Sequence, residues 1–512
     1  MEGKGSLVSS DTVKLALSDK QGDAMATWTK WRGRLFIIEI YMSLFILQFL
    51  TSSQLIQQNI FQKFARETLS ETHNYTAPNH SICLKQDYIV SATGNNDSII
   101  EIQKRANNLA MYLEVIGLCA SGVMALFYGS LSDIIGRKPI LTVALIGMTI
   151  MCAIQFAVIE FDLNNYSIWL IVAAGINGFL GGTATMLGVS FASVSDVTSR
   201  KWRTLRLGTT ESSIGFGKAA SYTVVYYWIN SNGCDFKGPA YTLIGIVPLT
   251  FIYLILLPES LPPKERRQNG GGFKKIANGI KVFIDPSRTG LSKWWRVWDC
   301  VAIISIECLC VIGVYQVINY FLHNEPLQWS YELIGIYGVV TALSTVVTLV
   351  IVLPLMIALP IPRQYMNPSF ILLASVIAVV TNIMMATVKH GQDWEMFLAG
   401  TVQTLQMIAF PSVRAILSGL VDAEDYGAVL SITASIQMFG SAGSTVLFNE
   451  IYRPEAEVNG HHYNAGIIFW ITAGFWASLI PLILLLFKKQ GETKTESVKL
   501  LTGSQDQYHT IQ

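Results

Sequence analysis

The most informative stretch of the sequence is Gly129-Ser-Leu-Ser-Asp133-Ile-Ile-Gly136-Arg137-Lys138-Pro139. It separates two long apolar runs, roughly residues 109–129 and 140–160. Glycines let two helices approach closely and let the chain turn tightly between them. We expect the acid and the two basic residues to form a charge cluster at a membrane surface. The alternative interpretation is a short basic loop that anchors two membrane helices.

The composition is that of a membrane protein. The chain has 512 residues, of which 51% are hydrophobic and 14% are charged, whereas soluble proteins carry about 25% charged residues. The lipid bilayer is therefore an expected partner. A net charge of +1 gives no reason to expect a nucleic-acid partner. The first apolar run starts too late and runs too long for a cleaved signal peptide, so we interpret it as a span that stays.

Apolar windows long enough to cross a bilayer, about 20 residues each, recur along the whole chain. They precede and follow one long polar segment, residues 259–298. Six windows on each side predict an all-α membrane protein with twelve transmembrane helices in two pseudo-symmetric six-helix bundles. The windows lie near residues 35–55, 109–129, 140–160, 167–190, 206–229, 240–258, 299–320, 333–358, 368–388, 395–419, 427–449 and 464–487.

The distribution of Lys and Arg predicts the orientation. With both tails in the cytoplasm, cytoplasmic segments contain 26 of the 36 basic residues, as the positive-inside rule requires. The predicted domains are a cytoplasmic tail (1–34), a first bundle (35–258) with a lumenal loop (56–108), a cytoplasmic linker (259–298), a second bundle (299–487) and a cytoplasmic tail (488–512).

Glycosylation sequons and cysteines agree with this orientation. Asn74, Asn79 and Asn96 each begin an Asn-x-Ser/Thr sequon in the first lumenal loop. Cys83 and Cys234 are the two cysteines in predicted lumenal loops, so they are the one pair able to meet in an oxidising compartment. A Cys83–Cys234 disulfide is the hypothesis, and two free thiols are the alternative.

The spacing from Gly129 to Lys138 resembles the loop signature between the second and third spans of major facilitator transporters. Over nearly all of residues 36–487 the chain further resembles solute carrier family 46, which includes the proton-coupled folate transporter and lysosomal relatives. The resemblance implies the major facilitator fold, a gating role for Asp133 and Arg137, and transport of organic anions or other small solutes, often driven by protons. The segments that carry it are Phe191-Ala-Ser-Val-Ser-Asp196, Glu211-Ser-Ser-Ile-Gly215, Pro411-Ser-Val-Arg414-Ala, Asp425-Tyr-Gly427-Ala and Phe448-Asn449-Glu-Ile-Tyr452.

Two features depart from the folate-carrying branch of that family. The fourth span reads Ile176-Asn-Gly-Phe-Leu-Gly-Gly-Thr183 and holds no charge, where that branch has an acid and an arginine. All seven histidines lie in loops or in the tail, whereas that branch has a histidine in the seventh span. These departures weigh against folate as the substrate, although not against the fold.

Four ionisable residues inside the spans are the candidates for transport chemistry, because such groups are costly in a bilayer and usually face a cavity. Glu211 in the fifth span and Glu307 in the seventh are the proton-coupling candidates. Lys218, two turns from Glu211 on the same helix face, suits a substrate anion or a neighbouring carboxylate. Arg414 in the tenth span offers a bidentate fork to an anionic substrate. The alternatives are a structural carboxylate for Glu211 and snorkelling to headgroups for the two basic residues.

Charged residues near the cytoplasmic ends of the spans are expected to act in gating or capping. Asp196 with Arg200, Arg203 and Arg206 predicts a second charge latch besides the Asp133–Arg137 cluster. For Glu39, near the start of the first span, we favour a solvated or capping carboxylate.

Uncharged polar side chains inside the spans are further substrate-binding candidates. The alternative for each is a hydrogen bond between helices or an aromatic at the membrane interface. We expect no metal and no cofactor other than the proton as coupling ion, and no enzyme activity. The polar candidates are Gln48, Gln54, Tyr222, Gln316, Asn319 and Gln406.

The C-terminal tail carries two sorting patterns. Glu496-Ser-Val-Lys-Leu500-Leu501 matches an acidic dileucine signal, and Tyr508-His-Thr-Ile511 matches Tyr-x-x-hydrophobic. Clathrin adaptor proteins bind such motifs, so we predict a multi-pass protein of the lysosomal or late endosomal membrane. The alternative location is the plasma membrane.

These features together predict a secondary active transporter that works by alternating access. It is expected to move an organic anion or amphipathic small molecule with protons, from an acidic lumen to the cytosol. Two alternatives remain open: a non-transporting membrane sensor or scaffold with a transporter fold, and a plasma-membrane facilitator without proton coupling.

Overall fold

The computed structural model describes residues 36–71, 96–163, 165–198, 202–232, 235–261, 291–323, 327–420, 426–451 and 466–508. All regular structure in these ranges is helical. The helices form long rods, some continuous and some interrupted, and every rod overlaps one predicted window. Ten of the rods, searched over the described residues, are long and apolar enough to cross a membrane. The other two are the rods that contain α8 and α19.

The N-terminal half contains six rods, two of which are interrupted. They are α2 (Ile37–Glu71), α4 (Asn96–Ile135), α5 (Arg137–Glu160), α6 (Tyr166–Phe179) with α7 (Gly182–Val197), α8 (Arg203–Tyr222) with η1 (Thr223–Tyr227) and α9 (Trp228–Ser231), and α10 (Lys237–Leu256).

The C-terminal half also contains six rods. They are α13 (Leu291–His323), α14 (Tyr331–Val347) with η2 (Thr348–Val352) and α15 (Leu353–Ile357), α16 (Arg363–Thr387), α17 (Asp393–Gln403) with η3 (Thr404–Ile408) and α18 (Ala409–Leu420), α19 (Tyr426–Ile451), and α20 (Ile467–Tyr508).

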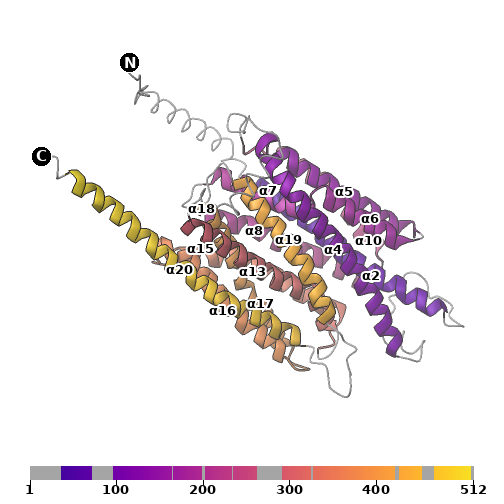
Figure 1. Ribbon diagram of the computed structural model, residues 1–512. Helices are drawn as coiled ribbons and strands as arrows, with labels where there is room; N and C mark the ends of the chain where they lie inside the picture. The colour runs from indigo at the N-terminus through magenta and orange to yellow at the C-terminus, as the bar shows by residue number, and fades with distance from the viewer. Residues whose placement is uncertain are drawn as a thin grey trace.

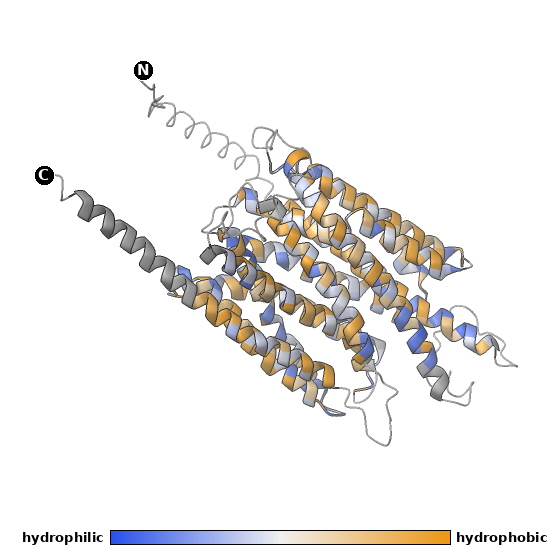
Figure 2. Ribbon diagram, viewed as in Figure 1, coloured by the Kyte–Doolittle hydropathy of each residue, from blue (hydrophilic) through white to orange (hydrophobic). Residues whose placement is uncertain are grey.

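The rods run roughly side by side, with the N-terminal half next to the C-terminal half (Figure 1). Apolar residues cover most of their length (Figure 2). Large apolar side chains are exposed on their outer faces, among them Ile255 at 69% and Leu355 at 65%. Such a surface would be unfavourable in water, but it matches the hydrocarbon of a bilayer. The twelve-helix membrane architecture predicted from the windows is confirmed.

Three boundaries differ from the sequence prediction. Both described ends of the predicted lumenal loop 56–108 are helical, because α2 continues to Glu71 and α4 begins at Asn96. Ala65 and Leu69 of α2 bury against Ile102 of α4, so apolar contacts at helical spacing extend both rods. At the other boundaries, α13 begins at residue 291, inside the predicted linker, and α20 continues to residue 508, inside the predicted tail.

The predicted loop after Gly129 is almost entirely helical. Gly129 and Asp133 lie in the last turns of α4, and α5 begins at Arg137. Gly136 alone makes the turn, with φ 109° and ψ 163°. Only glycine adopts that backbone conformation without strain. The turn therefore depends on this one glycine.

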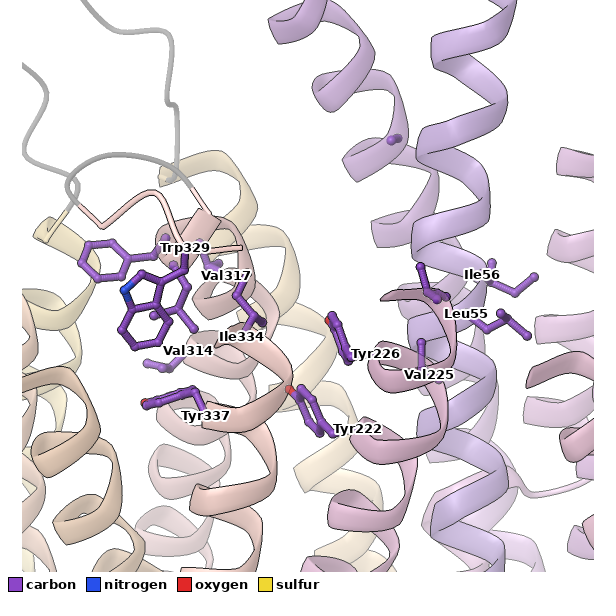
Figure 3. Close-up of a cluster of buried hydrophobic side chains, with 14 of the residues drawn as sticks. Leu55, Ile56, Tyr222, Val225, Tyr226, Val314, Val317, Trp329, Ile334 and Tyr337 are labelled. Atoms are coloured by element: carbon purple, nitrogen blue, oxygen red, sulfur yellow. The ribbon is translucent and has the colours of Figure 1, made fainter. Parts of the chain in front are cut away.

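Each half has its own apolar core, and a third cluster joins them at the predicted lumenal end. That cluster includes Leu55, Tyr222 and Tyr226 from the N-terminal half and Trp329 and Tyr337 from the C-terminal half. Figure 3 shows the rings of Tyr222 and Tyr226 projecting towards the side of Tyr337 and Trp329. The two halves are therefore packed against each other at this end.

The seam between α8 and α14 requires close backbone approach. A Cβ atom added at Gly215 of α8 would lie 2.9 Å from Val346 Cγ2 and 3.0 Å from the carbonyl oxygen of Ala342. One added at Gly338 of α14 would collide with the ring of Tyr222. Small residues at such positions let membrane helices pack closely. The seam positions α8, which carries two of the predicted transport residues, against the C-terminal half.

Candidate functional site

An ion pair joins the two halves at the centre of the molecule. Nη1 of Arg414, on α18, donates to Oε2 of Glu211, on α8. Each side chain is only 8% exposed. The rings of Phe191 and Phe410 lie 4.1 Å and 5.7 Å from the guanidinium carbon, which adds cation–π attraction. Two predicted transport residues from different halves therefore form one buried contact.

A second carboxyl completes this charge cluster. Glu307, on α13, is 0% exposed, and neither of its carboxylate oxygens has a hydrogen-bond partner in the described part of the chain. Arg414 and Glu211 are near enough to interact with it electrostatically. The cluster therefore holds two carboxyls and one guanidinium. It is neutral when one carboxyl carries a proton, and a buried cluster is least costly when neutral.

A cavity lies between the halves, further along α8. Its empty volume is about 700 Å³, including its open mouth. Lys218 lines it, seven residues after Glu211, which corresponds to about 10 Å along a helix axis. Among the described residues that line the cavity, Lys218 is the single charged side chain. The charge cluster and the cavity are therefore two separate layers of one central region.

Aromatic rings form one side of the cavity. The rings of Tyr222 and Tyr226 stack with centroids 5.3 Å apart and an interplanar angle of 11°. The ammonium nitrogen of Lys218 lies 5.0 Å from the ring centroid of Tyr315 and 5.7 Å from that of Tyr222. Tyr337 of α14 also lines the space. Lys218 is thus held between rings from α8 and α13, one in each half.

Uncharged polar groups form another side. Thr404 and Gln406 belong to η3, the interruption between α17 and α18. The hydroxyl groups of Thr404 and Thr348 hydrogen bond at 3.1 Å. Gln406 is 5% exposed, and its Oε1 atom is buried without a partner in the described residues. The lining is therefore polar as well as aromatic, although this acceptor atom of Gln406 is itself closed off from the cavity.

The predicted polar candidates divide into two groups. Tyr222, Asn319 and Gln406 line the cavity, as Lys218 does. Gln48 and Gln54 do not: Nε2 of Gln48 donates to Thr250 Oγ1 at 3.2 Å, and Oε1 of Gln54 accepts from Ser221 Oγ at 3.1 Å. These two glutamines bond helices together, which is the alternative interpretation given for them above. The side chain of Gln316 lies outside the described residues.

The gating motif forms a compact network at the predicted cytoplasmic end. Arg137 contacts Asp133 at 2.6 Å and Asp196 at 3.1 Å. Glu259, after α10, accepts from the backbone N–H of Arg137 at 2.9 Å and from that of Lys138 at 3.2 Å. All of these residues belong to the N-terminal half. The network therefore fixes four rods of one half to one another.

The second predicted latch requires correction. Asp196 forms its ion pair with Arg137, which lies outside the basic run that follows Asp196. Arg206 instead pairs with Glu39, which is 9% exposed and therefore not the solvated carboxylate expected, although it lies in the first turn of α2. Arg203 donates to the hydroxyl of Ser418 at 3.2 Å, across the seam. Packing of α8 against α2 and α18 directs these arginines away from Asp196.

Several predicted sites fall outside the described side chains. Asn74, Asn79, Cys83, Cys234 and Ile511 lie outside the described residues, as does Arg200. Asn96 is the first residue of α4, but its side chain is not described. The side chains of Glu496, Leu500, Leu501 and Tyr508, on α20, are likewise outside. The glycosylation, disulfide and sorting assignments remain predictions.

Sequence reasoning missed the roles of five ring-bearing residues. Phe191 and Phe410 lie against Arg414, and Tyr315, Tyr337 and Trp476 line the cavity. A signal existed for Tyr315, which follows Glu307 by eight residues and therefore lies on the same helix face. The other four had no such signal, because nothing in an apolar span distinguishes an inward ring from one that faces lipid.

Comparison with known proteins agrees with this architecture. The family model described as Major Facilitator Superfamily matches residues 96–445. The rat proton-coupled folate transporter is 22% identical over 393 residues, 75% of this chain and 79% of that protein. A chicken lysosomal proton-coupled steroid conjugate and bile acid symporter is 22% identical over 466 residues, 88% of this chain and 93% of that protein. The predicted resemblance to solute carrier family 46 is confirmed.

Solved structures show the same fold. The human organic anion transporter MFSD10 (TETRAN) has a TM-score of 0.61 at 14% identity, covering 87% of this chain and 99% of that chain. The proton:xylose symporter XylE has a TM-score of 0.58 at 15% identity, covering 89% and 96%. These matches are to transporters rather than enzymes.

Proposed function

Because the chain belongs to the Major Facilitator Superfamily, we propose that it is a proton-coupled symporter of an organic anion or amphipathic small molecule. The observation that carries this proposal is the buried cluster of Glu211, Arg414 and Glu307 at the seam. The names of the rat and chicken relatives, both proton-coupled, support the same assignment. Transport runs from an acidic lumen to the cytosol.

The cluster couples protonation to the contact between the halves. With Glu211 ionised, its carboxylate holds Arg414, and this pair ties α8 to α18. A proton on Glu211 removes the charge that attracts the guanidinium, which then has Glu307 as its nearest alternative carboxylate. The contact across the seam weakens, and the halves can rock. Release of the proton to the cytosol restores the pair. The pair therefore forms in one protonation state and not in the other, and a conformational switch requires such a difference.

Gating at the cytoplasmic end uses two sets of contacts. The Asp133–Arg137–Asp196 network holds the N-terminal rods as one body. The contact of Arg203 with Ser418 crosses the seam and breaks when that end opens. The rigid network preserves the shape of the N-terminal half while the weaker hydrogen bond across the seam breaks and re-forms.

Uptake into proteoliposomes tests the proposal. The full-length protein is assayed with steroid sulfates, bile acids and folates at an external pH of 5.5 or 7.4, with the interior at pH 7.4. We expect acid-stimulated accumulation of at least one anion, which Glu211→Gln and Glu307→Gln each abolish while substrate exchange partly persists. Glu332→Gln, at an exposed glutamate of α14, is the matched control.

The outcomes separate the alternatives. Uptake that ignores the pH gradient would favour a facilitator, and saturable binding without uptake would favour a sensor. Accumulation at full rate in Glu211→Gln would overturn the role given to that carboxyl. Full accumulation in Glu307→Gln would overturn the two-carboxyl cluster.

We further propose that clathrin adaptors bind the tail and direct the protein to lysosomal or late endosomal membranes. The chicken relative's name, which includes the word lysosomal, supports this location. Combined Leu500→Ala, Leu501→Ala and Tyr508→Ala changes are expected to move the protein to the cell surface, as measured by surface biotinylation. Val498→Ala, inside the dileucine pattern but at a variable position, should leave it internal. An unchanged distribution in the triple variant would refute adaptor sorting.

A further inference from the structure

The two cations of the central region differ in what neutralises them. Arg414 is buried, pairs with Glu211 and has Glu307 nearby. Lys218 is half-buried and has no carboxylate partner among the described residues; its ammonium group faces the rings of Tyr222 and Tyr315. An ammonium group partly removed from water without a counter-ion is costly. An anion in the cavity would remove that cost, whereas an anion at Arg414 would have to displace a carboxylate.

The surroundings of Lys218 also select a shape. The ammonium lies between two tyrosine rings, and a third ring, that of Tyr226, stacks on Tyr222 at 5.3 Å. A flat ligand ring packs against such surfaces at little entropic cost. An anionic group attached directly to that ring would then reach Lys218. The ring and the charge are therefore expected on the same end of the ligand.

The rest of the described lining carries no second charge. It includes the uncharged side chains of Thr404 and Gln406, and it contains no described carboxylate, so it offers no counter-charge to a cationic group. With one ammonium group and no second described cation, the lining suits a ligand with a single negative charge.

We propose that Lys218, and not Arg414, binds the anionic group of the substrate, and that the substrate is a flat-ring organic monoanion whose charged group is attached to the ring. This inference rests on the proposed transport function and names its substrate class. Proton coupling and substrate binding then occupy different layers of α8, at Glu211 and Lys218. Because Tyr315 belongs to the other half, a bound ligand touches both halves at once.

Equilibrium binding to the full-length protein in lipid nanodiscs tests the proposal without requiring transport. Two related probes differ in the charged group alone. Estradiol 3-sulfate has a sulfate on an aromatic ring, and estradiol lacks it. We expect the wild-type protein to bind estradiol 3-sulfate about 10- to 100-fold more tightly than estradiol, as a charged hydrogen bond implies.

Variants assign the contacts. Lys218→Gln should lose the preference for the sulfate ester, whereas Lys218→Arg should keep most of it because the charge remains. Lys63→Gln is the matched control, because Lys63 also lies over a tyrosine ring, 4.6 Å from the centroid of Tyr166, but outside the cavity.

Three results would overturn the inference. They are an unchanged affinity of Lys218→Gln for estradiol 3-sulfate, equal wild-type affinities for estradiol and its sulfate, and no saturable binding of any probe. A failure of the proposed function looks different. In that case the sulfate binds wild-type protein and depends on Lys218, but no pH gradient drives its uptake.

Discussion

Replacing Arg414 by leucine is expected to destabilise the protein at neutral pH by about 3–5 kcal/mol, the cost of leaving a buried charge without its partner. This range, which holds for buried ion pairs, applies because both side chains of the Arg414–Glu211 pair are only 8% exposed. An exposed ion pair would contribute about 0–1 kcal/mol. The loss is increased by Glu307, a second buried carboxyl that also interacts with this guanidinium.

The loss should depend on pH in a defined direction. In Arg414→Leu an ionised carboxylate has no cation, but a protonated carboxyl needs none. The folded variant therefore holds protons that the unfolded chain releases at neutral pH, so the variant gains stability relative to wild type as the pH falls. Thermal unfolding in nanodiscs at pH 7.5 and pH 5.0 measures this difference. Adding Glu211→Gln to Arg414→Leu should restore part of the stability at pH 7.5.

Two results would refute this reasoning. One is equal destabilisation by Arg414→Leu at both pH values, which would indicate that lost packing against Phe191 and Phe410 dominates the effect. The other is a double variant, Arg414→Leu with Glu211→Gln, no more stable than the single variant at pH 7.5. That result would show that the unpaired Glu211 carboxylate is not the source of the cost.

Three further predictions concern the frame around the site. Gly136→Ala should cost about 1–3 kcal/mol in thermal unfolding, because its φ of 109° suits glycine alone, whereas Gly474→Ala, in open space on α20, should not destabilise the protein. Gly338→Ala should displace the Tyr222 ring, and equilibrium binding of estradiol 3-sulfate should weaken while surface expression is kept. Arg137→Gln should remove the cation that lies between Asp133 and Asp196 at the cytoplasmic end, so both thermal stability and uptake should fall; unchanged values would contradict a rigid network.

The sequence alone determined the number and placement of the rods. A bilayer has no hydrogen-bonding groups in its core, so a span must be a helix of about 20 apolar residues, and such windows are visible without any tertiary information. The same argument identified Glu211, Lys218, Glu307 and Arg414, because charges are rare in that solvent. The lengths of the loops could not be predicted as well from the sequence, because α2 continues past its apolar window through contacts with α4.

Only the tertiary structure decided which of these residues meet. Glu211 and Arg414 are separated by 203 positions in the chain, and their contact depends on the packing of α8 against α18. Gln48 and Gln406 look alike in sequence, but one bonds α10 and the other lines the cavity. Helix rotation and neighbours determine that difference. Local sequence encodes the period of a helix, whereas the direction a side chain faces is set by surfaces distant along the chain.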